Sequence, residues 1–184
     1  MLHIICISLM LIACDKQEPL VLDVSNENLS LNNGVLEFND KPFTGTLVSH
    51  FSNGVLQSEM FYADGKKEGS EKQWFEDGVL AVERYYTKGM KIGIHKAWWD
   101  NGQLKFQYHF NDKGAFHGNV KEWDRTGLLF RDFNYENGKE SGSQRLWKQD
   151  GSIKSNYEVI NGERFGLIGL KKCYTVTANK DEIK

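Results

Sequence analysis

Apolar and polar residues alternate with a period of two along most of the chain, which is typical of strands with one packed face and one solvated face. The pattern is clearest when it is counted from a set of recurrent glycines, Gly54, Gly78, Gly102, Gly127 and Gly151. An apolar residue stands two places after each glycine, and a Tyr, Phe or Val stands eight places after it. The residue at offset five is acidic or an amide. The sequence therefore predicts one β-strand after each of these glycines.

A second strand is predicted in each unit, beyond a short turn. The turns are expected at glycine dipeptides: Asp64-Gly65, Lys88-Gly89, Lys113-Gly114, Asn137-Gly138 and Asn161-Gly162. Glycine, helped by Asn or Asp, accepts the positive φ that a tight hairpin needs. Four residues later comes another recurrent glycine, where we expect a bulge or a close backbone approach. Five residues beyond that glycine stands a tryptophan in four of the units: Trp74, Trp98, Trp123 and Trp147.

These units recur with a period of about 24 residues. The second set of glycines stands at positions 45, 69, 93, 118, 142 and 166, so successive spacings are 24, 24, 25, 24 and 24. We assign the extra residue between Gly102 and Gly114 to a bulge in the strand that holds His109 and Phe110. The first and last units carry His50 and Lys171 in place of tryptophan, as capping repeats with one neighbour would. The predicted fold is all-β, an elongated antiparallel meander of successive β-hairpins. Its repeat domain spans residues 33–174 in about six units, and a tail follows at residues 175–184.

The order and spacing of the aromatic residue, the turn glycine, the apolar strand and the second glycine resemble those of a known repeat family. The stretches WFEDGVLAVERYYTKGMKIG and WWDNGQLKFQYHFNDKGAFHG are similar to repeats of the MORN-repeat variant family, in particular to YwqK-like antitoxin-module proteins. The resemblance covers residues 33–170 and implies a MORN-like solenoid sheet. It leaves the activity open, and it implies an antitoxin-like or immunity-like role directed at an exported toxin.

The first thirteen residues, MLHIICISLMLIA, carry no acidic or basic side chain other than His3. They are too few to cross a bilayer core, which needs about 20 apolar residues, and they are typical of a secretory signal peptide. Leu11-Ile12-Ala13-Cys14 resembles the lipobox of bacterial lipoproteins, which implies that Cys14 is the lipid attachment site. Residues 14–32 are then a tether, and the protein is a lipid-anchored component of the cell envelope. The alternative is an ordinary apolar start in which Cys14 is a plain thiol.

Charge and motifs exclude several classes of function. The 23 basic and 25 acidic residues form no block of one sign, whereas a nucleic-acid partner requires clustered Lys and Arg. The chain lacks H-E-x-x-H, C-x-x-C, G-x-S-x-G and P-loop spacings. We therefore predict a non-enzymatic protein with no cofactor and no metal. The carboxylates Glu59, Glu83 and Asp132 are expected to form a solubilising row on the wet face, and Cys173 remains a lone thiol.

The tryptophans are the strongest candidates for binding. The four ladder tryptophans either stack between repeats as core, which we favour, or form an exposed row that binds sugars or peptides. Trp99 follows Trp98 directly, so we expect it to face the opposite side of the sheet and to be the candidate binding residue. The predicted function is a membrane-anchored scaffold that binds a protein partner in the bacterial cell envelope. A cell-wall polysaccharide-binding module is the alternative, and a purely structural spacer is the third possibility.

Overall fold

The computed structural model describes residues 20–169, which fold into strands joined by short turns. The predicted signal peptide, Cys14, Lys171, Cys173 and the tail lie outside the described residues. The strands are β1 (Val21–Asp23), β2 (Leu29–Asn32), β3 (Val35–Phe38), β4 (Lys41–Pro42), β5 (Gly45–His50), β6 (Leu56–Ala63), β7 (Lys66–Trp74), β8 (Leu80–Thr87), β9 (Met90–Trp98), β10 (Leu104–Phe110), β11 (Phe116–Trp123), β12 (Leu129–Glu136), β13 (Lys139–Trp147), β14 (Ile153–Ile160) and β15 (Glu163–Leu167).

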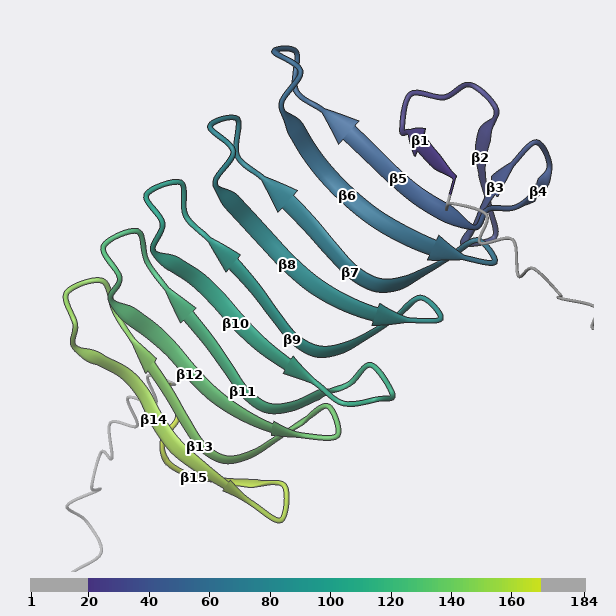
Figure 1. Cartoon of the computed structure of the whole chain (residues 1–184). Helices are drawn as coiled ribbons and strands as arrows, with labels where there is room; N and C mark the ends of the chain where they lie inside the picture. The colour runs from purple at the N-terminus through teal and green to yellow at the C-terminus, as the bar shows by residue number, and fades with distance from the viewer. Residues whose placement is uncertain (1–19, 170–184) are drawn as a thin grey trace, which may run out of the picture.

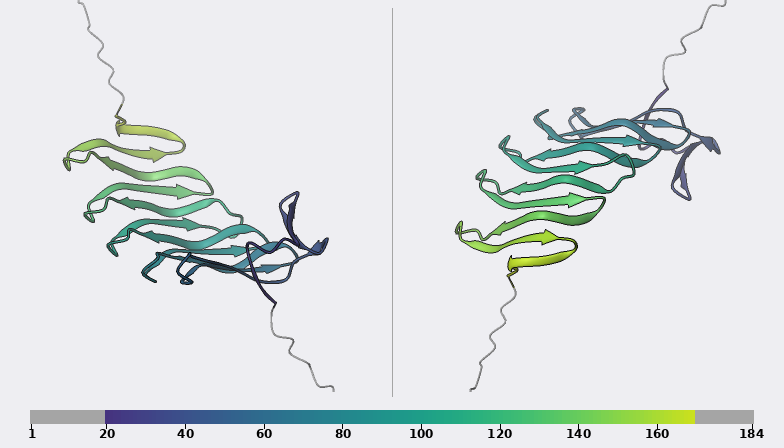
Figure 2. Two further views of the ribbon diagram at one scale, coloured as in Figure 1. Left: turned by 90° about the horizontal axis from the view of Figure 1, so that it is seen from above. Right: turned by 90° about the horizontal axis from the view of Figure 1, so that it is seen from below.

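Strands β5 to β15 form one long meander, in which each strand pairs antiparallel with the next (Figure 1). The views along the sheet show a single elongated layer, with β1 to β4 near one end and β15 at the other (Figure 2). The predicted fold class, an antiparallel meander of successive hairpins, is confirmed.

The N-terminal part of the described chain differs from the predicted tether. β1 pairs parallel with β5, in the register Val21↔Thr46, and β2 to β4 form a separate three-stranded sheet. That small sheet joins the first hairpin turn through Leu36 N–H, which donates to Gly65 O at 2.8 Å. Two strands therefore lie within residues 20–32. The physical reason is that β1 covers the open edge of β5, whose backbone groups would otherwise lack partners.

Four of the six recurrent glycines lie at β-bulges, as predicted: Gly69, Gly93, Gly118 and Gly142. Gly69, Gly93 and Gly142 have φ of 73°, 65° and 68°, and a Cβ at any of them would meet nothing within 4 Å. Positive φ therefore explains glycine at these three positions, and close packing does not. Gly45 at the first unit is different, because a Cβ there would lie 2.2 Å from Leu20 O.

The extra residue between Gly102 and Gly114 lengthens the β10–β11 turn, and the strand that holds His109 and Phe110 also carries a register shift toward β11, between Tyr108 and Phe110. His109 and Phe110 pair regularly with Ile94 and Gly93. Beyond them, Asn111 N–H donates to Ala115 O at 2.9 Å, and Asn111 Oδ1 accepts the N–H groups of Lys113 and Ala115. The Asn111 side chain thus stabilises a longer loop here. The other four glycine dipeptides have both residues at positive φ, as a two-residue hairpin turn requires.

One side of the sheet, which we call the packed face, carries the core. Its buried residues include Met60, Tyr86, Val120, Tyr157 and Val159, and these lie on strands separated along the sheet. The ladder tryptophans Trp74, Trp98, Trp123 and Trp147 are only half-buried. The prediction that these tryptophans form the core is therefore wrong. Several of the buried residues instead stand two places after a bulge glycine, as Val120 does, or pair with one, as Tyr86 and Val159 do.

Candidate functional site

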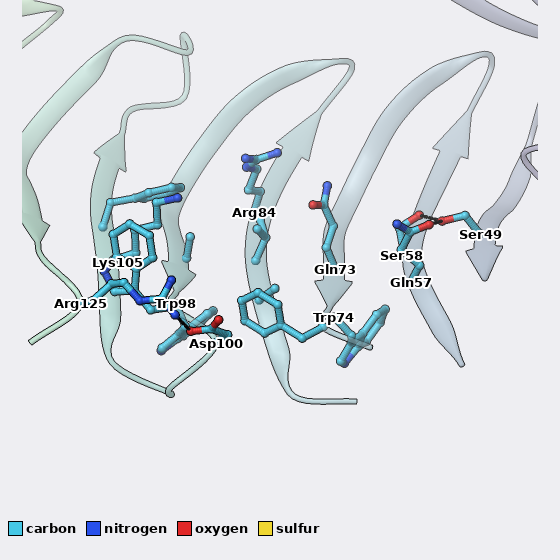
Figure 3. Close-up of a pocket in the computed structure, with 16 residues that line it drawn as sticks. Ser49, Gln57, Ser58, Gln73, Trp74, Arg84, Trp98, Asp100, Lys105 and Arg125 are labelled. Carbon is cyan, nitrogen blue, oxygen red and sulfur yellow. Dashed lines mark hydrogen bonds and ion pairs between the residues drawn. The ribbon is translucent and has the colours of Figure 1, made fainter. Parts of the chain in front are cut away.

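A broad depression of about 690 Å³ lies over β5 to β10 and is completed by Arg125 from the β11–β12 turn (Figure 3). Its floor is formed by side chains on the packed face that lie directly opposite one another on neighbouring strands. The register Ser49↔Ser58, Ser58↔Gln73, Gln73↔Val82, Val82↔Ala97 and Ala97↔Phe106 carries this row through six strands. Ser49 Oγ and Ser58 Oγ lie 2.6 Å apart at one end. The floor therefore changes from hydroxyl and amide groups to apolar groups along its length.

In three of the repeats, a β-bulge directs one more side chain to this depression. On β10 the register passes from Leu104↔Trp98 to Phe106↔Ala97, which leaves Lys105 without a partner on β9. Ala81 on β8 and Gln57 on β6 are left out of their pairings in the same way. All three residues line the depression. Bulges re-aim side chains in this manner, and they occur frequently beside functional sites.

Sequence reasoning missed these bulged residues, although a signal for them exists. They stand three places after the turn glycines, and the same place in the last two units is occupied by Phe130 and Lys154. The residue at this offset changes in size and charge from unit to unit, while its neighbours at offsets two and eight stay apolar. When the residue type at one position changes while its neighbours stay apolar, the fold does not require a particular side chain at that position.

Trp99, the predicted binding residue, does line the depression, but its indole is already engaged. Its Nε1–H donates to Trp123 O at 3.1 Å. Lys105 Nζ lies 4.3 Å from its ring centroid, and Arg125 Cζ lies 5.5 Å from it. These are cation–π distances. The side chain of Asp100 forms an ion pair with Arg125.

Trp99 was expected on the side opposite to the tryptophan ladder, and the structure differs from that expectation. Trp74, Trp98 and Trp99 all line the same depression. The prediction assumed strict alternation of side chains along β9. β9 ends at Trp98, and Trp99 lies in the following turn, where its N–H donates to Gln103 O at 2.8 Å, so strand alternation does not set its direction.

The depression carries positive charge. Arg84 Nη1 makes a long contact of 3.4 Å with Glu71 Oε1, and Lys67 Nζ holds the other oxygen of Glu71 at 2.8 Å. Burial raises the pKa of the Glu71 carboxyl, but the Lys67 hydrogen bond and charge outweigh this effect, so its pKa is lowered and the carboxylate stays ionised. Among residues 20–169, Lys105 forms no ion pair. Three cationic side chains and one carboxylate line the depression: Lys105, Arg125 and Arg84, and Asp100.

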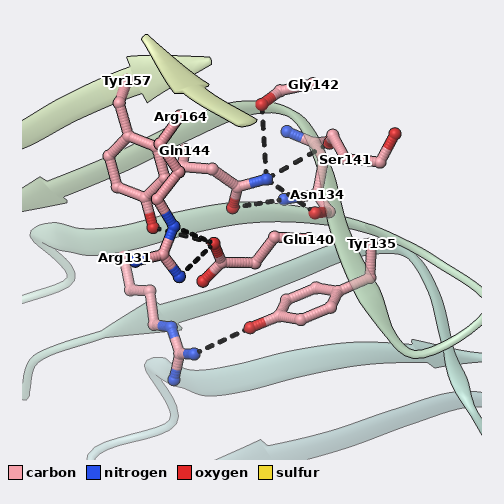
Figure 4. Close-up of polar contacts among 9 residues, drawn as sticks. All are labelled: Arg131, Asn134, Tyr135, Glu140, Ser141, Gly142, Gln144, Tyr157 and Arg164. Carbon is pink, nitrogen blue, oxygen red and sulfur yellow. Dashed lines mark hydrogen bonds and ion pairs between the residues drawn. The ribbon is translucent and has the colours of Figure 1, made fainter. Parts of the chain in front are cut away.

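A second group of buried polar residues lies two places beyond the bulge glycines. Glu71, His95 and Gln144 occupy this position and are 4%, 2% and 0% exposed. Gln144 Nε2 donates to Asn134 O at 2.7 Å, and Gln144 Oε1 accepts Asn134 N–H at 3.2 Å (Figure 4). Nearby, Glu140 Oε2 accepts Tyr157 O–H at 3.1 Å and pairs with Arg164 at 2.9 Å. Each of these polar groups has a partner inside the sheet, which indicates a structural role.

The predicted carboxylates lie on the face opposite the packed one. Glu59, Glu83 and Asp132 pair across strands with Lys72, Lys96 and Arg145, among other neighbours. Within residues 20–169, no group of three or more His, Cys, Asp or Glu side chains is placed to hold a metal ion. The same part of the chain contains no helix that is long and apolar enough to span a membrane.

The architecture defines an elongated repeat protein whose open sheet offers a surface rather than an enclosed pocket. Residues 67–88 and 91–112 match the family model of the MORN repeat variant. No curated protein matches the chain. The two matched segments contribute Gln73, Ala81 and Arg84 from one unit, and Ala97, Trp99 and Lys105 from the next, to the depression. Two segments of the chain are thus similar to the MORN repeat variant, and they contribute the middle part of the depression, whose ends come from residues outside them.

Proposed function

We propose that this protein is a non-enzymatic binding module that holds a protein partner against the packed face of its sheet. The observation that carries the proposal is the open depression over β5 to β10, where bulged side chains from three repeats are added to a cross-strand floor. Repeat proteins commonly use such extended surfaces for binding, because each repeat contributes one strip of a larger area. A partner of ordinary size needs about 800 Å² on each side.

The same proposal includes a lipid anchor at Cys14 in the bacterial cell envelope and an antitoxin-like or immunity-like role. The support for the anchor is the apolar run of residues 1–13 followed by Leu11-Ile12-Ala13-Cys14. Radioactive palmitate should label the wild-type chain, and Cys14→Ala should lose the label and leave the membrane fraction. A Cys14→Ala protein that stays in the membrane fraction contradicts the anchor.

Photo-crosslinking in cells tests the binding face. A photoreactive amino acid replaces Gln57, which is exposed and lines the depression, or Glu59, which is exposed on the opposite face of the same strand. We expect a covalent protein adduct from position 57 and a much weaker one from position 59. Adducts from position 59 alone would place the partner on the other face.

The alternative function, binding of a cell-wall polysaccharide, is tested in a parallel experiment. Purified cell wall is sedimented with wild-type protein and with Trp99→Ala. Co-sedimentation that is lost in Trp99→Ala, together with no protein adduct from position 57, would replace the protein partner by a glycan.

A further inference from the structure

We infer that the depression takes an extended acidic peptide segment, whose carboxylates lie at the end formed by Trp99, Lys105 and Arg125. This inference rests on the proposed function, because it names the chemistry of the partner that the module binds. It is drawn from the charge, the geometry and the length of the depression.

The first argument is the state of Lys105. It is exposed, it is directed to the depression by a bulge, and it forms no ion pair among residues 20–169. Its ammonium lies over the Trp99 indole at 4.3 Å, which fixes the charge in place without neutralising it. An ammonium held in this way is prepared to receive an anion. A carboxylate is the anionic group that proteins carry in their side chains and at their C-terminus.

The second argument concerns Arg125, which lies across Trp99 from the next repeat. Its backbone carbonyl accepts Asn101 Nδ2–H at 2.7 Å, and its guanidinium pairs with Asp100. The guanidinium carries five N–H donors, so the pair with Asp100 leaves donors for a second carboxylate. Lys105 and Arg125 thus provide two cationic contacts over one indole.

The third argument decides between a peptide and a sugar. Binding of a neutral sugar to Trp99 would need a free indole face and usually a free N–H. Here the N–H is used by Trp123 O, and the ring is covered by two cations. Trp99 therefore acts as a support for Lys105 and Arg125, which favours a carboxylate-bearing ligand over stacked sugar rings.

The fourth argument is the length and asymmetry of the depression. From Ser49 to Lys105 it crosses six strands, or five spacings of about 4.8 Å, which gives roughly 24 Å. An extended peptide covers that distance with about seven residues, at roughly 3.3 Å each. Lys105 and Arg125 lie at one end, and Ser49, Gln57 and Ser58 lie at the other, while Arg84 between them already contacts Glu71. The segment is therefore acidic at one end and polar but uncharged at the other.

A displayed library of random heptapeptides tests the inference with the full chain as bait. The variant Lys105→Glu reverses the free charge, and Lys113→Glu is the matched control, because Lys113 is exposed in a turn that does not line the depression. We expect the selected peptides to be enriched in Asp and Glu at one end. Synthetic copies should bind Lys105→Glu about tenfold or more weakly and Lys113→Glu as well as wild type. Binding should also weaken as salt is added.

Several outcomes would overturn the inference. These are selected peptides without acidic enrichment, no enrichment at all, or acidic peptides that bind Lys105→Glu as tightly as wild type. Binding of an oligogalacturonate with the same Lys105 dependence, when no peptide binds, would also overturn it, because the carboxylates would then come from a glycan. A protein adduct from position 57 alongside any of these results would leave the proposed function intact. The absence of any protein adduct would remove the proposed function itself.

Discussion

His95 Nε2 lies 3.2 Å from the backbone nitrogen of Tyr85 and 2.9 Å from its carbonyl oxygen. The register between β8 and β9 shifts at this point, between Glu83 and Tyr85, which interrupts the regular backbone hydrogen bonds. The His95 side chain supplies contacts to the Tyr85 backbone there. Gln144 does the same for Asn134 in a later repeat, with separate donor and acceptor atoms. One imidazole nitrogen either donates or accepts in a given tautomer. His95 therefore satisfies one of the two Tyr85 groups, and Gln144 satisfies both Asn134 groups.

Replacing His95 by glutamine should therefore stabilise the protein. The amide can donate to Tyr85 O and accept from Tyr85 N–H, as Gln144 does at Asn134, and one added net hydrogen bond contributes about 0.5–1.5 kcal/mol. His95→Ala removes both contacts and should cost about 1–3 kcal/mol. Urea unfolding followed by tryptophan fluorescence measures both changes. A His95→Gln protein that unfolds at lower urea than wild type would show that the imidazole is held by its aromatic neighbours, Tyr86 and Phe110, rather than by Tyr85.

The same residue makes stability depend on pH. Burial lowers the pKa of His95, and the charges of Arg84 and Lys91 lower it further, against the hydrogen bond to Tyr85 O, which raises it. Burial also lowers the pKa of His109, with Lys121 and Lys96 adding to the effect. The unfolded chain, with a histidine pKa of about 6.5, then binds more protons than the folded chain at mildly acidic pH. Stability is fully present above about pH 6.5 and falls as the pH drops below it.

Urea midpoints at about pH 7.5 and about pH 5.5 measure this loss. We expect wild type to lose more stability than His95→Gln over this interval, and His109 to account for part of the loss that remains in the variant. Equal losses in the two proteins would mean that the pKa of His95 is the same in the folded and the unfolded chain.

Much of the sheet could be predicted because its rules are local. The alternation that places Met60 and Tyr62 on one face and Glu59 on the other is a property of any strand. The positive φ of Asn137 and Gly138, or of Asn161 and Gly162, follows from residue types that tolerate that conformation. Repetition of these signals every 24 residues then fixed the order of strands.

The features that escaped prediction depend on contacts between distant residues. Nothing near Val21 indicates that it will pair in parallel with Thr46. The extra residue at Asn111 could be counted but could not be assigned to strand or turn without the register of Phe110. The bulge at Lys105 is visible only once β9 and β10 are aligned. The candidate site is thus formed by departures from alternation, and alternation was the rule on which the sequence prediction relied.

Gly65 should be far less replaceable than Gly89, although both occupy the second place of a two-residue turn. Their φ values are 74° and 81°, so alanine costs each about 1–2 kcal/mol. A Cβ on Gly65 would also lie 2.3 Å from Val35 Cγ1 and 2.6 Å from Leu36 O, whereas on Gly89 its nearest neighbour is 3.8 Å away. Gly65→Ala should therefore displace β2 to β4 from the sheet.

Hydrogen exchange measures that displacement directly. The Leu36 amide, bonded to Gly65 O in wild type, should exchange much faster in Gly65→Ala and at the wild-type rate in Gly89→Ala. Protection of Leu36 that survives in Gly65→Ala would show that the buried ring of Phe43 is sufficient to hold the small sheet in place.

Opposite charges alternate across the face that lies behind the core. Glu59 pairs with Lys72, Lys72 with Glu83, and Glu83 with Lys96. The row continues through Lys121, Asp132 and Arg145. Cross-strand pairs of opposite charge contribute modestly to stability, and like charges directly opposite one another oppose it. The alternation is interrupted on β10, where uncharged Gln107 stands between Lys96 and Lys121.

Reversing one charge in this row should destabilise the sheet in proportion to the number of like neighbours it creates. Glu83→Lys places a cation between Lys72 and Lys96, and we expect a loss of about 1 kcal/mol at low salt. Glu59→Lys creates one such pair, because its other neighbour is Val48, so its loss should be about half as large. Urea unfolding at low and high salt measures both losses, which should shrink together as salt is added. Equal losses for the two variants, unchanged by salt, would mean that strand propensity at these positions outweighs the charges.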